Sequence, residues 1–90
     1  NILAYMRKDR AGNEYLVVIN FAGAKADGYR LGVPKGKYKI VFNTDSPKFG
    51  GAGEMTKRIF NTERKHSHGK EYSIKIELPK LTCVYLQKIL

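Results

Sequence analysis

The chain has 90 residues, of which 17 are lysine or arginine and 8 are aspartate or glutamate, so its formal net charge is +9. This length allows one domain with a small core and excludes a barrel enzyme. The share of apolar residues, 42%, excludes a disordered basic tail. We therefore expect a single folded domain over residues 1–90.

Cysteine content and chain ends bear on the cellular context. Cys83 is the only cysteine, so no internal disulfide can form, and no Cys/His spacing typical of a zinc site is present. No stretch approaches the roughly 18 uninterrupted apolar residues of a membrane span. The first residue is asparagine rather than methionine. We expect a cytoplasmic protein without cofactor or metal, and a piece of a longer polypeptide.

Apolar runs separated by turn residues predict strands throughout the chain. Asp, Gly and Asn residues at 9–13 favour a chain reversal, which predicts a first hairpin. Pro34-Lys35-Gly36 predicts a second hairpin between the strands on either side of it. Residues 45–53 contain three glycines and a proline and are expected to form a long loop. The predicted strands are, in chain order, 2–8, 14–21, 29–33, 37–44, 55–60, 70–78 and 81–86.

These short strands and the absence of a helical pattern indicate an all-β fold, an antiparallel Greek-key β-sandwich of about seven to eight strands. Residues 70–78 alternate cleanly, with Tyr72, Ile74, Ile76 and Leu78 on one face. In residues 37–43 the core face is expected to hold Tyr38, Ile40 and Phe42.

The first two strands differ because both of their faces are apolar. In the second strand, Tyr15 and Val17 lie on one face, while Leu16 and Val18 make the opposite face apolar too. A strand that is apolar on both faces in a two-layer fold needs a second partner, unless the outward aliphatic residues are incidental. We expect the outward face to contact something absent from this chain, and either pair could point outward. The candidate contact residues are Leu3, Tyr5, Tyr15, Leu16, Val17 and Val18.

No residue pattern supports catalysis. The loop Gly50-Gly51-Ala52-Gly53 lacks the lysine, the third glycine and the following helix of known phosphate-binding loops. His66 and His68 have no further metal ligand nearby, and Cys83 lies in an apolar strand where a buried role is expected. The carboxylates have no predicted cleft that would pair two of them for glycoside chemistry.

Two binding functions remain as alternatives. A stand-alone carbohydrate-binding module would need coplanar exposed aromatic rings, for which Tyr5, Tyr15, Tyr29 and Tyr72 are candidates. A basic β-barrel that binds single-stranded nucleic acid would explain the charge. The basic residues are, however, spread over nearly every turn instead of gathering with aromatic residues on one strand pair, which makes nucleic acid the weaker alternative.

Several segments carry a family resemblance. They resemble, in order and spacing, the C-terminal all-β domain of 1,4-α-glucan (glycogen) branching enzymes. The most specific match is Asn43-Thr44-Asp45-Ser46 followed by Phe49-Gly50-Gly51. The others include the opening Asn-Ile-Leu-Ala-Tyr-Met-Arg, the run Leu-Val-Val-Ile-Asn-Phe at 16–21, Tyr-Arg-Leu-Gly-Val-Pro at 29–34, His68-Gly69 and Leu78-Pro79.

The resemblance implies a fragment of an α-amylase-type glycosyltransferase. In that family a separate (β/α)-barrel domain cleaves an α-1,4-glucan chain and transfers it to a 6-hydroxyl, and the C-terminal sandwich packs beside the barrel. None of the family's catalytic motifs lies in these residues, so no catalytic residue is carried over. The resemblance implies that Asn43, Asp45, Phe49, Gly50 and Gly51 serve as turn and interface residues. It makes the barrel the expected partner, with α-glucan a possible ligand.

Overall fold

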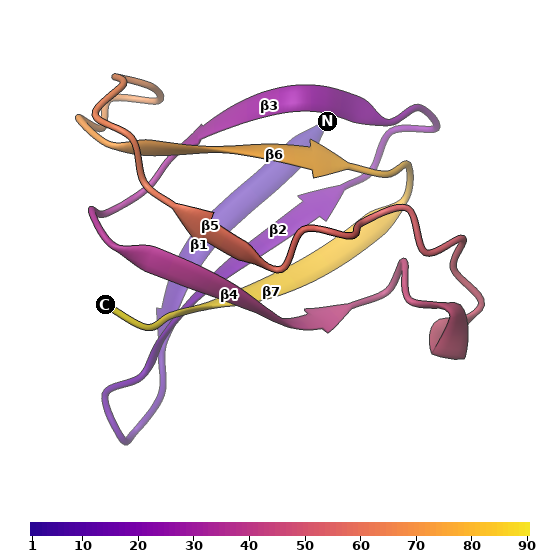
Figure 1. Ribbon diagram of the computed structural model, residues 1–90, viewed down its shortest axis with the longest axis horizontal. Coiled ribbons are helices and arrows are strands. Elements are labelled where there is room, and N and C mark those ends of the chain that lie inside the picture. Colours follow the sequence, from indigo (N-terminus) through magenta and orange to yellow (C-terminus); the bar gives the residue numbers. More distant parts are fainter.

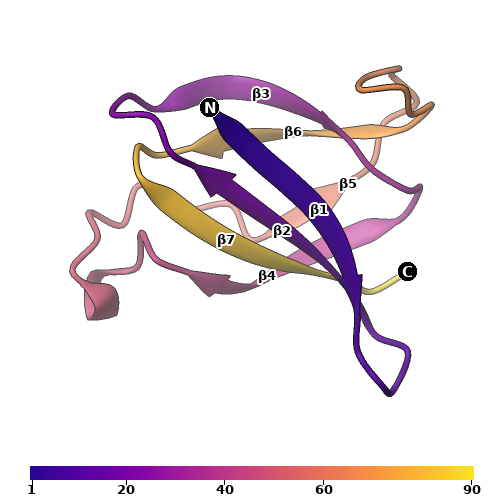
Figure 2. The same cartoon turned by 180° about the vertical axis from the view of Figure 1, so that it is seen from behind.

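The computed structural model describes all residues, 1–90, as seven antiparallel strands in two sheets. The larger sheet has the order β1-β2-β7-β4-β5 and the smaller one pairs β3 with β6. Figure 1 shows β3 and β6 side by side with β1 and β2 behind them, and Figure 2 brings β1 to the front. The strands are β1 (Ile2–Lys8), β2 (Glu14–Asn20), β3 (Ala26–Gly32), β4 (Lys37–Asn43), β5 (Ile59–Asn61), β6 (Ser73–Leu78) and β7 (Thr82–Lys88).

The all-β sandwich predicted from the sequence is confirmed. A bridge between Glu63 and Ser73 joins β5 to β6, so the neighbouring strands β3-β6-β5-β4 follow Greek-key order. The only helical segment is a short 3₁₀ helix, η1 (Pro47–Phe49), within the predicted loop. The structure contains no helix long and apolar enough to cross a membrane.

A single core fills the space between the sheets. Twelve buried apolar side chains form it, and Ile74, Ile76 and Leu78 from the alternating β6 are among them, as the pattern predicted. Tyr72, predicted on the same face, precedes the strand and is not part of the core. Ser73, on the other face of β6, is also buried, and the guanidinium of Arg30 satisfies its hydroxyl by donating a hydrogen bond of 2.9 Å. The buried phenol of Tyr38 donates to the carbonyl of Pro34 at 2.7 Å. Burial raises the pKa of Tyr38 to about 12.

The predicted second hairpin is wrong. The first one forms, with β1 pairing β2, but β3 pairs β6 while β4 pairs β5 and β7. The turn at Pro34-Lys35-Gly36 therefore carries the chain from one sheet to the other. Local turn chemistry permits a reversal but does not decide which strands pair. The short strand predicted at 55–60 forms at Ile59–Asn61 instead.

Phe42 does not lie in the core, contrary to the alternation predicted for 37–43. The pairing of β4 with β7 shifts by one residue between Ile40 and Phe42, which is a bulge. A bulge inserts one residue and turns the following side chains to the opposite face. Phe42 consequently lies opposite Tyr85 and is exposed.

Candidate functional site: the outer face of the larger sheet

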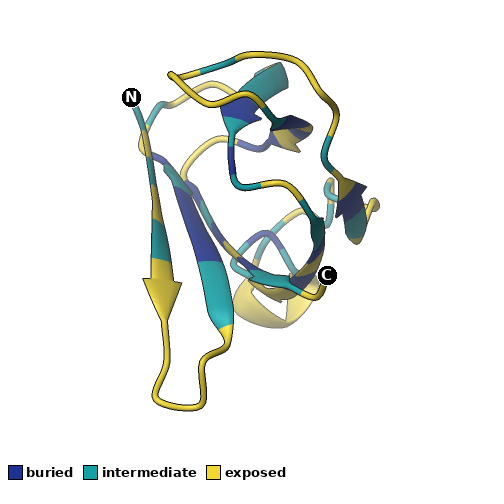
Figure 3. Cartoon of the chain, turned by 90° about the vertical axis from the view of Figure 1, so that its left-hand side faces the viewer, coloured by how far each residue is buried: buried dark blue, intermediate teal, exposed yellow.

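Apolar side chains cover most of the face of the larger sheet that points away from the core, which we call the outer face. At one end of it Arg7, Gln87 and Lys39 form a polar row with Tyr15. The pairing register places Tyr5, Val17 and Tyr85 in one row across β1, β2 and β7, and Leu3, Ile19 and Cys83 in the next. Figure 3 shows exposed and half-buried residues alternating along β1, beside the buried middle of β2. The outer face comprises Leu3, Tyr5, Tyr15, Val17, Ile19, Phe42, Phe49, Cys83 and Tyr85.

The structure decides which face of β2 points outward. Leu16 and Val18 are 2% and 0% exposed and belong to the core, so they cannot contact a partner. The prediction that Leu16 and Val18 are contact residues is therefore wrong. They lie on the face of the first hairpin that packs on the core, together with Ile2, Ala4 and Met6 of β1. Tyr15 and Val17 point outward. Val17 is itself only 1% exposed, since Tyr5 and Tyr85 flank it on the neighbouring strands, so it too offers no surface to a partner in this structure.

An aromatic row extends the outer face past the C-terminal end of β4. The ring of Phe42 lies 5.3 Å from that of Tyr85 and 5.3 Å from that of Phe49 in η1. The interplanar angles are 59° and 51°, so the rings are tilted against one another. Sugar rings stack on flat platforms, which this row does not provide, whereas tilted rings pack well against apolar side chains.

The loop after β4 holds Phe49 in this position. The side chain of Asn43 accepts a hydrogen bond from the amide of Asp45 at 2.9 Å, and the carboxylate of Asp45 accepts one from the amide of Met55 at 2.9 Å. Gly50 has a φ of 82°, a left-handed conformation that ends η1. A Cβ at Gly51 would lie 2.1 Å from the carbonyl oxygen of Asp45, so only glycine fits there. These loop residues fix a tight turn and present Phe49 beside Phe42.

The predicted four tyrosines do not form one carbohydrate platform. Tyr5 and Tyr29 line a groove between β1 and β3, whereas Tyr15 borders a different pocket, with Val17 and Tyr85. Tyr72 lies apart from both, under the ammonium group of Lys35, which is 5.5 Å from its ring centroid.

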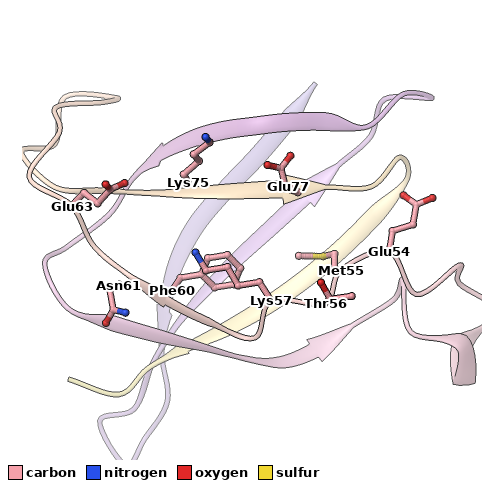
Figure 4. Close-up of a pocket in the computed structure, with 9 residues that line it drawn as sticks. All are labelled: Glu54, Met55, Thr56, Lys57, Phe60, Asn61, Glu63, Lys75 and Glu77. Carbon is pink, nitrogen blue, oxygen red and sulfur yellow. The ribbon is translucent and has the colours of Figure 1, made fainter.

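A polar cleft of about 460 Å³ lies between the segment leading into β5 and strand β6 (Figure 4). Glu54, Glu63 and Glu77 line it, but Glu63 and Glu77 stand near opposite ends of β6. Glu63 accepts a hydrogen bond from Arg30 at 3.0 Å, which lowers the pKa of its carboxyl group. Glu77 accepts one from the amide of Gly28 at 2.7 Å. A glycosidase acid needs a raised pKa, so Glu63 does not suit that role, and its distance along β6 from Glu77 does not favour a carboxylate pair.

The remaining candidates from the sequence, a histidine metal site and a nucleophilic cysteine, are not supported by the structure. The ring of His68 accepts a hydrogen bond from the amide of Gly32 at 3.2 Å and contacts the hydroxyl of Tyr29 at 3.3 Å. No cluster of three or more histidine, cysteine or carboxylate groups could hold a metal ion. Burial raises the pKa of the Cys83 thiol, the direction opposite to that of a nucleophilic cysteine.

Comparison with known proteins places the chain in a family. The family model for the alpha amylase C-terminal all-beta domain matches residues 1–89. The chain is similar to three proteins named 1,4-alpha-glucan branching enzyme GlgB. It is 36% identical to that of Halothermothrix orenii, 38% to that of Photobacterium profundum and 35% to that of Vibrio cholerae.

These alignments cover 99%, 96% and 97% of the chain but only 14%, 12% and 12% of the relatives. The chain thus spans a small part of the relatives' length, and that part coincides with the two-sheet sandwich described above. The chain belongs to the alpha amylase C-terminal all-β domain family.

Proposed function

We propose that the chain is the accessory C-terminal domain of a 1,4-α-glucan branching enzyme. The proposal is carried by the sequence alignments. Nearly the whole chain aligns with proteins named as such enzymes, and each alignment covers 12–14% of the relative's length. The parent protein would transfer an α-1,4-glucan chain to a 6-hydroxyl group and so create an α-1,6 branch. Without a catalytic constellation of its own, the domain would serve the parent by supporting its fold.

The outer face would be the contact with the catalytic (β/α)-barrel domain. Leu3, Tyr5 and Tyr85 are 48%, 43% and 39% exposed on it, and Phe42 and Phe49 continue the apolar surface. Contiguous exposed apolar side chains of this kind mark interaction sites. A neighbouring domain would bury them, at a gain of about 25 cal/mol for each Å² of apolar surface removed from water.

The net charge of +9 would keep the chain soluble and would complement the neighbouring domain. Glucan carries no charge, so lysine and arginine are not needed for its recognition. Opposite charge on the adjoining surface of the barrel domain would complement them. The free thiol of Cys83 fits a reducing compartment, and we place the parent in the cytoplasm.

A branching assay tests the activity. The full-length polypeptide that carries this domain should convert amylose into a product whose iodine absorbance falls and which releases linear chains after debranching. The 90-residue chain alone should leave amylose unchanged. A full-length polypeptide that forms no α-1,6 linkages would refute the proposed parent.

A matched pair of variants tests the contact. Phe42→Gln alters the outer face, whereas Leu81→Gln alters an apolar side chain that is 68% exposed in the β6–β7 turn. We expect Phe42→Gln to lower the melting temperature of the full-length polypeptide by several degrees more than that of the 90-residue chain. Leu81→Gln should change neither. Equal effects of Phe42→Gln in both proteins would show that the outer face makes no interdomain contact.

A further inference from the structure

A second apolar surface lies where the sandwich is open, between strands β1 and β3. Neither strand has a second neighbour, because β1 pairs only β2 and β3 pairs only β6. A groove of about 580 Å³ runs between them. Five consecutive residues of β1, Ile2 to Met6, form one bank, and Tyr29, Leu31 and His68 lie on the other. In Figure 2 β1 lies at the front and β3 runs along the top of the molecule.

Hydrogen bonds at both ends of the first hairpin show which backbone groups of β1 are free. The amide of Phe21 donates to the carbonyl of Asn1 at 2.9 Å, and the amide of Asp9 donates to the carbonyl of Asn13 at 2.9 Å. Antiparallel pairing alternates, so the odd-numbered residues of β1 bond to β2. The amide and carbonyl groups of Ile2, Ala4 and Met6 therefore point to the free edge, along the groove.

This combination of an apolar groove and an unpaired strand edge fits an added β-strand. Main-chain hydrogen bonds would hold such a segment, and pockets would take every second side chain. At roughly 3.3 Å per residue, the edge from Ile2 to Met6 accommodates about five extended residues. The half-buried Ile2 and Met6 and the buried Leu31 provide apolar contacts for side chains that point inward.

The charge of the chain disfavours a second copy as the occupant. The β1 strand of such a copy carries Arg7 and Lys8 and no acidic side chain, and the whole chain has a net charge of +9. The groove has Lys70 at its rim and no carboxylate among its lining residues. An occupant with an acidic residue would complement this charge.

We propose that an extended segment from the rest of the longer polypeptide lies in this groove and pairs with the free edge of β1. The segment alternates apolar and polar side chains and carries an acidic residue near Lys70. The inference rests on the proposed function, in which the domain is a small part of one long chain. Covalent attachment would supply the segment at a high effective concentration.

Amide hydrogen exchange tests the proposal residue by residue. In the 90-residue chain the amides of Ala4 and Met6 should exchange fast, while the amide of Tyr5 is protected by its bond to β2. In the full-length polypeptide the amides of Ala4 and Met6 should exchange at least tenfold more slowly. Equally fast exchange in both proteins would overturn the proposal. Protection that appears in the 90-residue chain and grows with its concentration would also overturn it, because a second copy would then cover the edge.

Two proline variants provide the matched control. Ala4 and Lys8 both direct their amides to the free edge, where proline is tolerated, but Lys8 lies outside the groove. In the full-length polypeptide Ala4→Pro should raise the exchange rate of the Met6 amide at least tenfold, toward the rate in the 90-residue chain. Lys8→Pro should leave that rate unchanged. The wild-type comparison stands even if a variant fails to fold. Fast exchange at Ala4 together with normal branching activity would refute the groove proposal and leave the proposed function intact.

Discussion

Replacing Gly51 with alanine tests how the loop after β4 is built. The added methyl group would lie 2.1 Å from the carbonyl oxygen of Asp45, 2.2 Å from its carbonyl carbon and 2.5 Å from its Cα. All three are backbone atoms, so no side-chain rotation can relieve the clash. Asp45 is held in place, because its carbonyl accepts a hydrogen bond from Gly53 at 2.8 Å and its carboxylate accepts one from Met55 at 2.9 Å.

The size of the clash sets the expected cost. An ordinary contact begins near 3.4 Å, so the two backbone segments must separate by roughly 1.3 Å. Forced displacements of this kind cost about 1–3 kcal/mol, and the loss of the Asp45 hydrogen bonds places Gly51→Ala at about 3 kcal/mol. For a chain of this size that lowers the melting temperature by more than about 10 °C.

Gly50→Ala is the matched control. Gly50 has a φ of 82°, but a Cβ there would meet no atom within 4 Å. Only the left-handed backbone then opposes the substitution, at about 1 kcal/mol. Urea unfolding followed by circular dichroism measures both variants. A Gly51→Ala protein as stable as Gly50→Ala would refute the close approach of Gly51 to Asp45.

Three further predictions concern the core and two titrating groups. Leu16→Ala should lower the free energy of unfolding by about 2–5 kcal/mol and Leu3→Ala by less than about 1 kcal/mol, measured by urea denaturation; equal losses would contradict the assigned faces of the first hairpin. The raised pKa of Tyr38, about 12, means that the unfolded chain loses this proton first, so stability should fall by up to about 2 kcal/mol between pH 10 and 12. The variant Tyr38→Phe should lose that part of the pH dependence, and identical pH profiles for the two proteins would contradict it. Arg30 lowers the pKa of Glu63, so this pair should stabilise the fold above the usual carboxyl pKa and lose its effect as the pH falls; titration of Glu63 by NMR in Arg30→Gln should show a higher pKa than in the wild type.

The fold class and the approximate positions of most strands were predictable because they depend on local patterns. The strict alternation of β6 placed Ile74, Ile76 and Leu78 in the core, where the structure has them. The turn residues at 9–13 predicted the first hairpin, whose strands are neighbours in both sequence and space. Such features need no information about distant residues.

The pairing of β3 and β4 could not be predicted in the same way. Their turn looks like that of a hairpin, yet β3 pairs with β6, more than forty residues further along the chain. The bulge that exposes Phe42 likewise arises where β4 meets β7. Both features depend on contacts between segments far apart in the sequence, and no local pattern records them.

The candidate site was likewise predictable only in part. From the sequence alone it followed that the first two strands are apolar on both faces and that no catalytic constellation is present. Only the tertiary structure decided that Leu16 and Val18 fill the core while Tyr15 and Val17 face outward, because a strand's two faces are chemically alike until a second sheet covers one of them. The fold also joined Phe42, Phe49 and Tyr85 into one aromatic row and left the edge of β1 unpaired beside an apolar groove. Those surfaces arise from the packing of two sheets, which the order of residues does not display.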